Sequence, residues 1–132
     1  MPFEEIRHTA DYSVRVWARD MPSLFSEAAR GMNSLSGMQL DEAHHFTKEI
    51  QLSAFDYESL MVAFLSELIF IAEHERIGFD SLIINLENTT LHATLQGARI
   101  ISKGKAIKAV TFHNLKIIRT GEFLEAVLVF DV

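Results

Sequence analysis

The feature that most constrains this chain is one long apolar helix pattern that is followed only by strand patterns. Residues 57–76 contain neither Gly nor Pro and repeat apolar side chains at helical spacing, and Asp56 before them is a good N-cap. We expect Gly78 to end this helix. Apolar residues alternate beyond it over residues 82–86, 91–95, 107–118 and 123–131, with turns at Asn88-Thr89 and Thr120-Gly121.

The first half of the chain carries a shorter version of both patterns. Residues 12–18 alternate as a strand does, and Asp20 can cap a helix that has Pro22 in its first turn and ends near Gly37. Alternation returns over residues 46–54. This order predicts an α+β fold, a single-domain sandwich with two helices on one face of a largely antiparallel or mixed sheet. It fits a regular doubly wound α/β fold poorly.

Composition limits the class of protein. A chain of 132 residues predicts a single domain over residues 1–132 that buries about two-thirds of its unfolded surface. An apolar content of 48% excludes a disordered chain, and the absence of Cys excludes disulfide scaffolds, zinc fingers and thiolate nucleophiles. The acidic start lacks the apolar stretch of a secretory signal, and no apolar run has the length of a membrane span. We therefore expect a soluble cytoplasmic protein without a membrane partner.

Charge is distributed unevenly along the chain. Residues 88–121 hold six of the 12 Lys and Arg residues and none of the 18 Asp and Glu residues, so the rest of the chain is strongly acidic. One reading is a basic face for an anionic partner, in which Lys103, Lys105 and Lys108 would contact RNA, nucleotide or an acidic protein surface. The other reading is a solvated strand region. The net charge of −6 argues against general nucleic-acid binding.

Carboxylates at the chain ends are the candidate metal ligands. Alternation along the last strand places Asp131 on the side of Val127 and Val129, next to the terminal carboxylate of Val132. Two adjacent negative charges repel one another, and a hard divalent cation with oxygen ligands would relieve that repulsion. Asp11 is the candidate third donor if the first and last strands are neighbours. Alternatively, Asp131 is a solvated tail residue and Asp11 a turn former.

None of the histidines makes a metal site by spacing alone. His8 and His113 lie in polar segments between strands, where a hydrogen-bonded structural role competes with a role beside a site. His44 and His45 are adjacent and make a poor chelate. His74 is suited to the C-terminal end of its helix, and His92 to the wet face of its strand. Glu67 interrupts an apolar helix, where it is either on the polar face or a buried acid. No phosphate loop, nucleophile elbow or zinc-protease motif occurs.

Four segments together resemble the archease family. They are residues 8–11 (HTAD), residues 60–71 (LMVAFLSELIFI), residues 107–113 (IKAVTFH) and the ending at residues 129–132 (VFDV). The resemblance covers essentially the whole chain in order. Two departures stand out: Tyr12-Ser13 follows HTAD where the family has a small or aliphatic residue and then Gly, and Ser66 begins the family's Asn-Glu-Leu motif. Neither departure falls on a proposed ligand, and Tyr12 would reshape the rim of the site.

The resemblance implies a protein cofactor without catalytic residues of its own. Archeases act with the RNA-splicing ligase of tRNA splicing and RNA repair, promoting guanylylation of its active-site histidine and its multiple turnover. The family's divalent metal site, which is taken to hold calcium, corresponds here to Asp11, Asp131 and Val132, and oxygen ligands suit magnesium or manganese equally. RNA or nucleotide would be met only through the ligase complex. Two alternatives remain: a chaperone-like modulator of a tRNA methyltransferase, and a metal-dependent hydrolase with His8 as its base.

Overall fold

The computed structural model confirms the α+β prediction. It describes residues 2–7, 12–43, 45–112 and 114–132. The elements in chain order are β1 (Phe3–Arg7), β2 (Tyr12–Ala18), α1 (Met21–Ser36), β3 (Gln39–Leu40), β4 (Phe46–Ser53), α2 (Tyr57–Glu75), β5 (Ile77–Glu87), β6 (Thr90–Ser102), β7 (Ala109–Thr111), β8 (Ile118–Thr120) and β9 (Phe123–Asp131). Within the described part of the chain, no helix is long and apolar enough to span a membrane.

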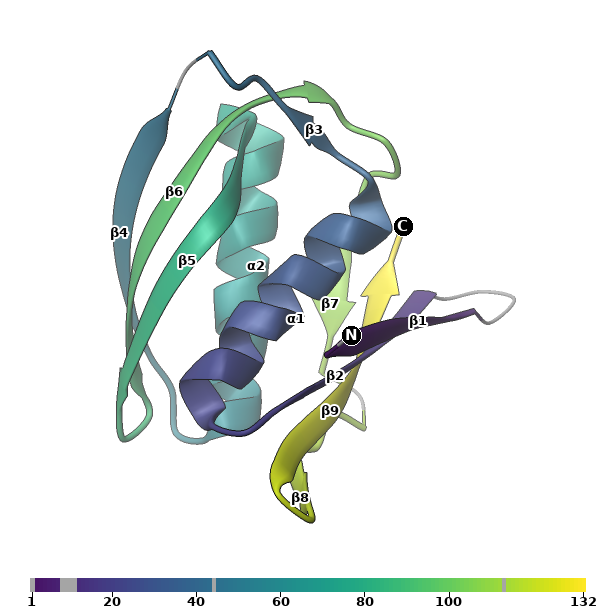
Figure 1. The fold of residues 1–132 in the computed structure, drawn as a ribbon, viewed down its shortest axis with the longest axis vertical. Helices are drawn as coiled ribbons and strands as arrows, with labels where there is room; N and C mark the ends of the chain where they lie inside the picture. The colour runs from purple at the N-terminus through teal and green to yellow at the C-terminus, as the bar shows by residue number, and fades with distance from the viewer. Residues whose placement is uncertain (1, 8–11, 44, 113) are drawn as a thin grey trace.

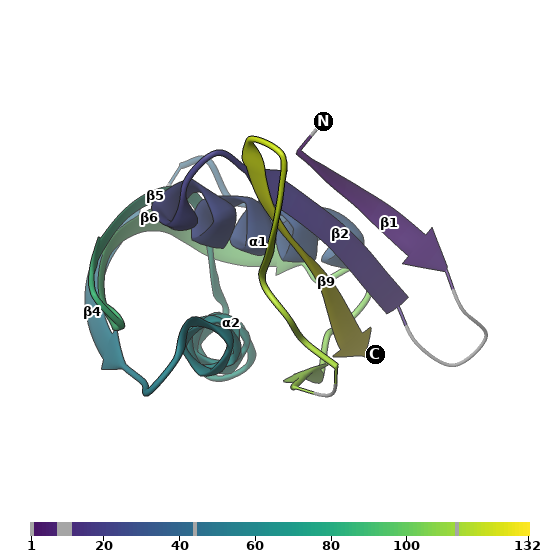
Figure 2. The same ribbon diagram turned by 90° about the horizontal axis from the view of Figure 1, so that it is seen from below.

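The strands divide between two antiparallel sheets. One sheet has the order β1-β2-β9-β7, with β8 also paired to β9, and the other has the order β3-β6-β4, with β5 also paired to β6. Figures 1 and 2 show the second sheet curving around α2, while α1 runs between the two sheets. The contacts agree, because α1 packs on β2 and β5, and α2 packs on β4, β5, β6 and β7. The two helices therefore join the sheets through one core.

Capping residues set the ends of both helices. Asp20 and Asp56 each accept a hydrogen bond from a backbone N–H three residues on, at 2.8 and 2.7 Å, as the sequence predicts. That bond lowers the pKa of Asp20 below its usual value, because the backbone N–H of Ser23, and then its hydroxyl, favour the ionised carboxylate. Gly37 ends α1 with φ of 69°.

The expected end of α2 at Gly78 is wrong. Arg76 caps the helix with φ of 58°, and Gly78 lies inside β5. The absence of a side chain at Gly78 instead leaves room for two neighbouring side chains. A Cβ on Gly78 would lie 2.6 Å from the sulfur of Met38 and 2.8 Å from Cδ2 of Leu40. Those two side chains already occupy the space over β5.

A single strand over residues 107–118 is also wrong. The segment forms only β7, and β8 begins at Ile118. Between them the chain turns, with the N–H of Leu115 donating to the carbonyl of Phe112 at 3.1 Å and Asn114 at φ of 59°. Burial explains the interruption, because Leu115 is 6% exposed and belongs to the core. β1, which the alternation did not predict, extends the first sheet beyond β2.

Candidate functional site

The start of β2 and the end of β9 lie side by side. In their antiparallel register Tyr12 is opposite Phe130, and Val14 is opposite Leu128. Phe130, Val14 and Leu128 are fully buried, so a slip of one residue would expose this side of the pair and bury its polar side. The prediction that the strand of residues 12–18 neighbours the last strand is confirmed. Buried side chains therefore fix which residues of the first segment meet the chain end.

Asp131 and Val132 form the acidic end of β9. The side chain of Asp131 is exposed, on the outer sheet face that it shares with Val127 and Val129, as alternation predicts. Its backbone carbonyl accepts a hydrogen bond from the N–H of Lys108 at 2.8 Å, and β7 pairs with it through Ala109. Val132 is 37% exposed. The carboxylate of Asp131 is thus open to solvent at the end of a paired strand, and it offers oxygen donors of the kind that hard cations prefer.

The third candidate ligand and the two candidate site neighbours lie outside the described residues. Asp11, His8 and His113 belong to that part of the chain, so their roles stay predictions. Among the described residues no three His, Cys, Asp or Glu side chains gather closely enough to hold a metal ion. Tyr12, the residue that follows Asp11 in sequence, is paired with Phe130, the residue that precedes Asp131. This pairing brings together the two strands whose neighbouring residues the three-residue site would use.

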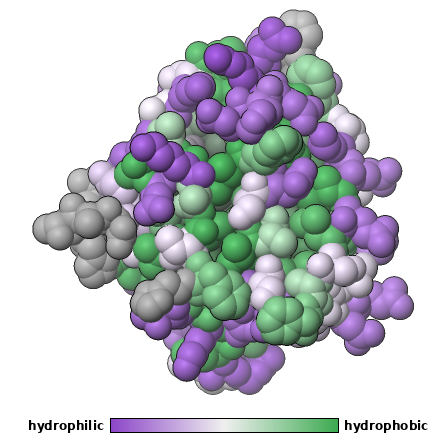
Figure 3. Space-filling view, turned by 180° about the vertical axis from the view of Figure 1, so that it is seen from behind, coloured by the Kyte–Doolittle hydropathy of each residue, from purple (hydrophilic) through white to green (hydrophobic). Residues whose placement is uncertain are grey.

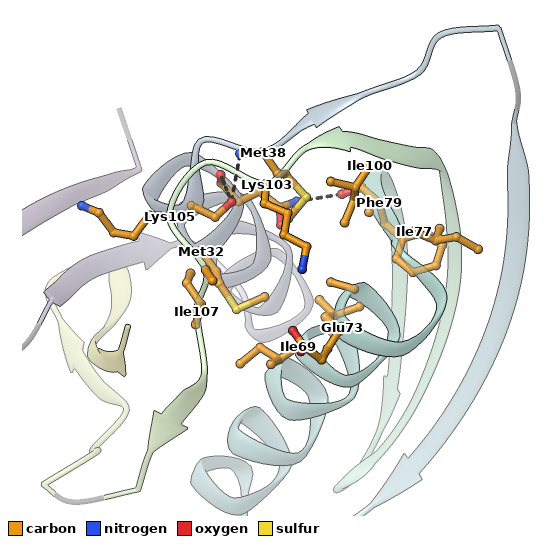
Figure 4. Close-up of a pocket in the computed structure, with 16 residues that line it drawn as sticks. Met32, Met38, Ile69, Glu73, Ile77, Phe79, Ile100, Lys103, Lys105 and Ile107 are labelled. Atoms are coloured by element: carbon orange, nitrogen blue, oxygen red, sulfur yellow. Dashed lines mark hydrogen bonds between the residues drawn. The ribbon is translucent and has the colours of Figure 1, made fainter.

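The three candidate lysines do not share one environment. Lys105 places its Nζ 3.8 Å from the ring centroid of Tyr12, a cation–π contact between the loop after β6 and the first residue of β2. Lys108 is tied to Asp131 through its backbone and leaves its side chain exposed. Lys103 extends instead towards α2, as Figure 4 shows. Lys105 and Lys108 therefore lie near the start of β2 and the end of β9, and Lys103 and Lys105 both line a pocket.

That pocket was not predicted from the sequence. Five segments enclose it: the C-terminal ends of α1 and α2, the start of β5, the end of β6 and the loop after β6. Its lining is mostly apolar and includes Met32, Ile69, Phe79 and Ile107, while Lys103 and Glu73 lie at its mouth (Figure 4). The signal that could have indicated it is that the apolar residues of α2 extend beyond the single ridge that the core needs, to Ile69 and Ala72. Which other segments complete the pocket depends on the tertiary fold.

The described histidines have ordinary surroundings. His74 stacks on Phe70 with ring centroids 4.1 Å apart, and its Nδ1 lies 3.1 Å from the carbonyl oxygen of Phe70, so it is part of the end of α2. His92 is exposed on β6, as expected for the wet face of that strand. Glu67 is half-buried on α2 rather than enclosed in the core. These residues add no candidate catalytic group.

The fold and the chain-end arrangement define a class of small α+β proteins whose first segment and last strand meet in one sheet. Solved structures of this class are similar over nearly the whole chain. A crystal structure of an archease, possible chaperone, from Thermotoga maritima matches with a TM-score of 0.73 and 26% identity, over 98% of this chain and 96% of that one. The solution structure of protein 1598 from Methanobacterium thermoautotrophicum matches with a TM-score of 0.71 and 25% identity, over 99% of both chains.

The sequence comparisons give the family. The archease of Methanosarcina barkeri is 30% identical over 139 residues, covering 98% of this chain and 95% of that protein. The archease of Sulfurisphaera tokodaii is 25% identical over 140 residues, covering 98% of both. The archease-like protein of Dictyostelium discoideum is 26% identical over 141 residues, covering 98% of this chain and 93% of that protein. Residues 3–132 match the Archease protein family, and the chain belongs to it.

Proposed function

We propose that this protein activates an RNA-splicing ligase, promoting guanylylation and repeated turnover of the ligase in tRNA splicing and RNA repair. It is a protein cofactor and performs no catalysis itself. Family membership supports this proposal. The observation that links the proposal to particular residues is the register between β2 and β9. In that register Tyr12 is opposite Phe130, and Asp131 follows Phe130 at the end of β9.

Asp11, Asp131 and Val132 would hold a divalent cation, with calcium first and magnesium or manganese as alternatives. The donor set fits such an ion, because Asp131 and the terminal carboxylate supply exposed oxygen atoms at the end of a strand that is buried on its other side. A bound cation would screen the repulsion between the two carboxylates and order the chain end. The protein's own contribution is the rigid β7–β9–β2 framework that presents these oxygens to a partner.

Lys105 and Lys108 would contact the ligase, its nucleotide or its RNA at the same end of the molecule, and Lys103 would contribute from the neighbouring loop. Support comes from Lys108, whose backbone binds Asp131, and from Lys105, whose cation lies against Tyr12. Cations beside an acidic metal site would stabilise an anionic partner group close to the ion. Partner contact through these lysines should weaken as salt rises, because exposed charges are screened.

The test is a ligation assay with a purified RNA-splicing ligase, GTP and RNA that carries 3′-phosphate and 5′-hydroxyl ends. Addition of this protein should raise the rate of ligase guanylylation and the number of turnovers. Asp11→Ala and Asp131→Ala should abolish that stimulation and weaken calcium binding measured by calorimetry. Asp80→Ala, at an exposed acid on β5, is the matched control and should stimulate as the wild type does. Full stimulation by both chain-end variants would contradict the metal-site role.

A second reading is a chaperone-like protein that keeps an RNA-modifying enzyme, such as a tRNA methyltransferase, soluble and active. The Thermotoga relative carries the description possible chaperone, which supports this reading. Light scattering of the methyltransferase on heating, with and without this protein, separates the two functions. Suppressed aggregation without any change in ligation would favour the chaperone. Turnover of an RNA substrate by the purified protein alone would instead indicate a hydrolase.

A further inference from the structure

The outward side of α2 carries apolar residues that the core does not cover completely. The helix buries its inner side through Leu60, Phe64, Leu68 and the residues beside them. Its other side carries Val62 and Ile69, which are half-buried and pack against the core, and Phe70, which is 51% exposed. Ser59, Ser66 and Glu73 lie among these residues, so this side of the helix is mixed in character.

The arrangement of the elements leaves this side open. Figure 2 shows α2 at the margin of the molecule, with the curved sheet and α1 on its inner side. In Figure 3, which views the face opposite to that of Figure 1, hydrophobic residues gather across the centre of the surface. Contiguous apolar surface of this kind marks interaction sites in folded proteins. We call the outward residues Ser59, Val62, Ala63, Ser66, Ile69 and Phe70 the α2 outer face.

The α2 outer face continues into the pocket. Ile69 belongs to both, and Ala72 and Glu73 extend the lining towards Met32 and Phe79. The pocket has a volume of about 60 Å³. Sites for whole small-molecule ligands are typically about 300–1,000 Å³, so this pocket is suited to a single inserted side chain. An open apolar face beside a pocket for one side chain is the arrangement that anchors a protein partner.

Small residues along the middle of the α2 outer face favour a helical occupant. Ser59, Ala63 and Ser66 follow one another at steps of four and three residues and so lie in one row. Short side chains in such a row allow another backbone to approach closely. Val62, Ile69 and Phe70 provide apolar contacts beside that row. An amphipathic helix laid against another helix makes contacts at this spacing.

Charge selects which helix fits. α2 contains four Glu residues and neither Lys nor Arg. Glu75 pairs with Lys48 at 3.1 Å, and the carboxylate of Glu58 accepts a hydrogen bond from the N–H of Ile117. Within the part of the chain that the structure describes, Glu67 and Glu73 have no hydrogen bond or ion pair. Both are therefore available to basic groups of a partner: Glu67 follows Ala63 by four residues at one edge of the α2 outer face, and Glu73 follows Ile69 by four residues at its C-terminal end.

The same charges disfavour the other occupants. A second copy that paired through α2 would bring acidic side chains against acidic side chains, since the helix has no Lys or Arg and its one histidine, His74, is stacked on Phe70. RNA and anionic membranes would meet the same repulsion from Glu67 and Glu73. Lys103 lies across the pocket mouth from Glu73, and Lys105 also lines the pocket; both belong to the loop after β6 and not to the α2 outer face.

We propose that the α2 outer face docks a basic amphipathic helix of a partner protein, with one apolar side chain of that helix in the pocket. Lys or Arg residues of the partner pair with Glu67 and Glu73. This is a second interaction surface, and none of Asp11, Asp131 and Val132 belongs to it. It therefore stands or falls independently of the chain-end site.

The test uses a synthetic 18-residue amphipathic helix with Leu on one face and Lys on the other, and a matched peptide with Glu in place of Lys. Calorimetry should give the Lys peptide a dissociation constant of about 100 μM or tighter and the Glu peptide no measurable binding. Ala63→Glu, which blocks the row of small residues, should weaken binding of the Lys peptide at least tenfold. Glu67→Gln with Glu73→Gln should weaken it and flatten its salt dependence.

Controls separate this surface from others. Ile83→Glu changes a residue of β5 that is 60% exposed and should leave peptide binding unchanged, as should Asp131→Ala, whatever that variant does to ligation. Circular dichroism confirms that each variant is folded. The proposal is overturned if the Lys peptide does not bind, if the Glu peptide binds equally, or if Ala63→Glu binds as the wild type does. Self-association in sedimentation that Ala63→Glu abolishes would identify a second copy as the occupant and overturn it too.

Discussion

Replacing Gly104 with Ala should lower the free energy of unfolding, because Gly104 lies in the loop beside the candidate site in a conformation and a contact that a methyl group would disturb. Its φ of +58° is a conformation that L residues adopt at a cost, and a Cβ there would lie 2.2 Å from the carbonyl oxygen of Ser36. The atoms are backbone on both sides, so no side chain can move aside. The same carbonyl accepts the N–H of Lys105, which ties the loop after β6 to the end of α1.

The expected cost of Gly104→Ala has two parts. The left-handed conformation contributes about 1–2 kcal/mol. The displaced backbone contributes about 1–3 kcal/mol, the usual range for overpacking. The sum is a loss of about 2–5 kcal/mol in the free energy of unfolding, measured by urea denaturation with an unchanged m-value. Because Lys105 follows directly, the variant should also release the Lys105–Tyr12 contact, visible as a change in the tyrosine ring resonances.

Gly121→Ala is the matched control for this prediction. Gly121 has φ of +65° but no atom within 4 Å of the position of its Cβ, so it carries the conformational cost without the close approach. It should lose about 1–2 kcal/mol. The difference between the two variants measures the contact with Ser36. Equal losses in the two variants would refute the argument that the loop is held by that close approach.

Three further substitutions test other parts of the structure. Asp20→Ala should lower the free energy of unfolding by about 1 kcal/mol at neutral pH. Because folding lowers the pKa of Asp20, this carboxylate stabilises the protein above its unfolded pKa of 3.8, and the stabilisation should fade below that pH in acid denaturation curves. Phe64→Ala removes a fully buried ring whose centroid lies 5.9 Å from that of Phe25, and should cost about 3–5 kcal/mol in the same urea assay. Tyr12→Leu and Lys105→Met should each cost about 0.5–1 kcal/mol, and the double variant should cost less than their sum if the cation–π contact is real.

Local rules predicted the helices and the last strand because local chemistry decides them. A carboxylate that accepts a hydrogen bond from a free N–H of the first turn fixes where α1 and α2 begin, whatever they pack against. Strict alternation fixed β9 at residues 123–131. The segment of residues 107–118 failed because its apolar residues serve two purposes. Some pair in β7, whereas Leu115 turns into the core, and period alone does not distinguish a strand from a buried turn.

Some features of the candidate site also follow from local sequence, and others depend on the tertiary fold. The outward direction of Asp131 follows from alternation along one strand, and so it could be predicted. The pocket could not, since its walls come from three stretches, residues 32–38, 68–79 and 100–107, that are far apart in the chain and meet only through tertiary packing. The open face of α2 is an intermediate case. The sequence shows apolar residues on more than one side of the helix, and only the packing shows which of them the other elements leave partly uncovered.

β9 shows how the core and the candidate site depend on one strand. Its even-numbered residues Leu124, Ala126, Leu128 and Phe130 are buried, and its odd-numbered residues face outward. Because side chains alternate strictly, burial of Phe130 forces Asp131 outward, and the register with β2 that the core selects decides what lies beside it. A deletion of one residue within β9 would keep the composition of the chain end and reverse its direction. The position of the acidic end is thus a property of the core, which is why changes in buried residues should reach the site without touching it.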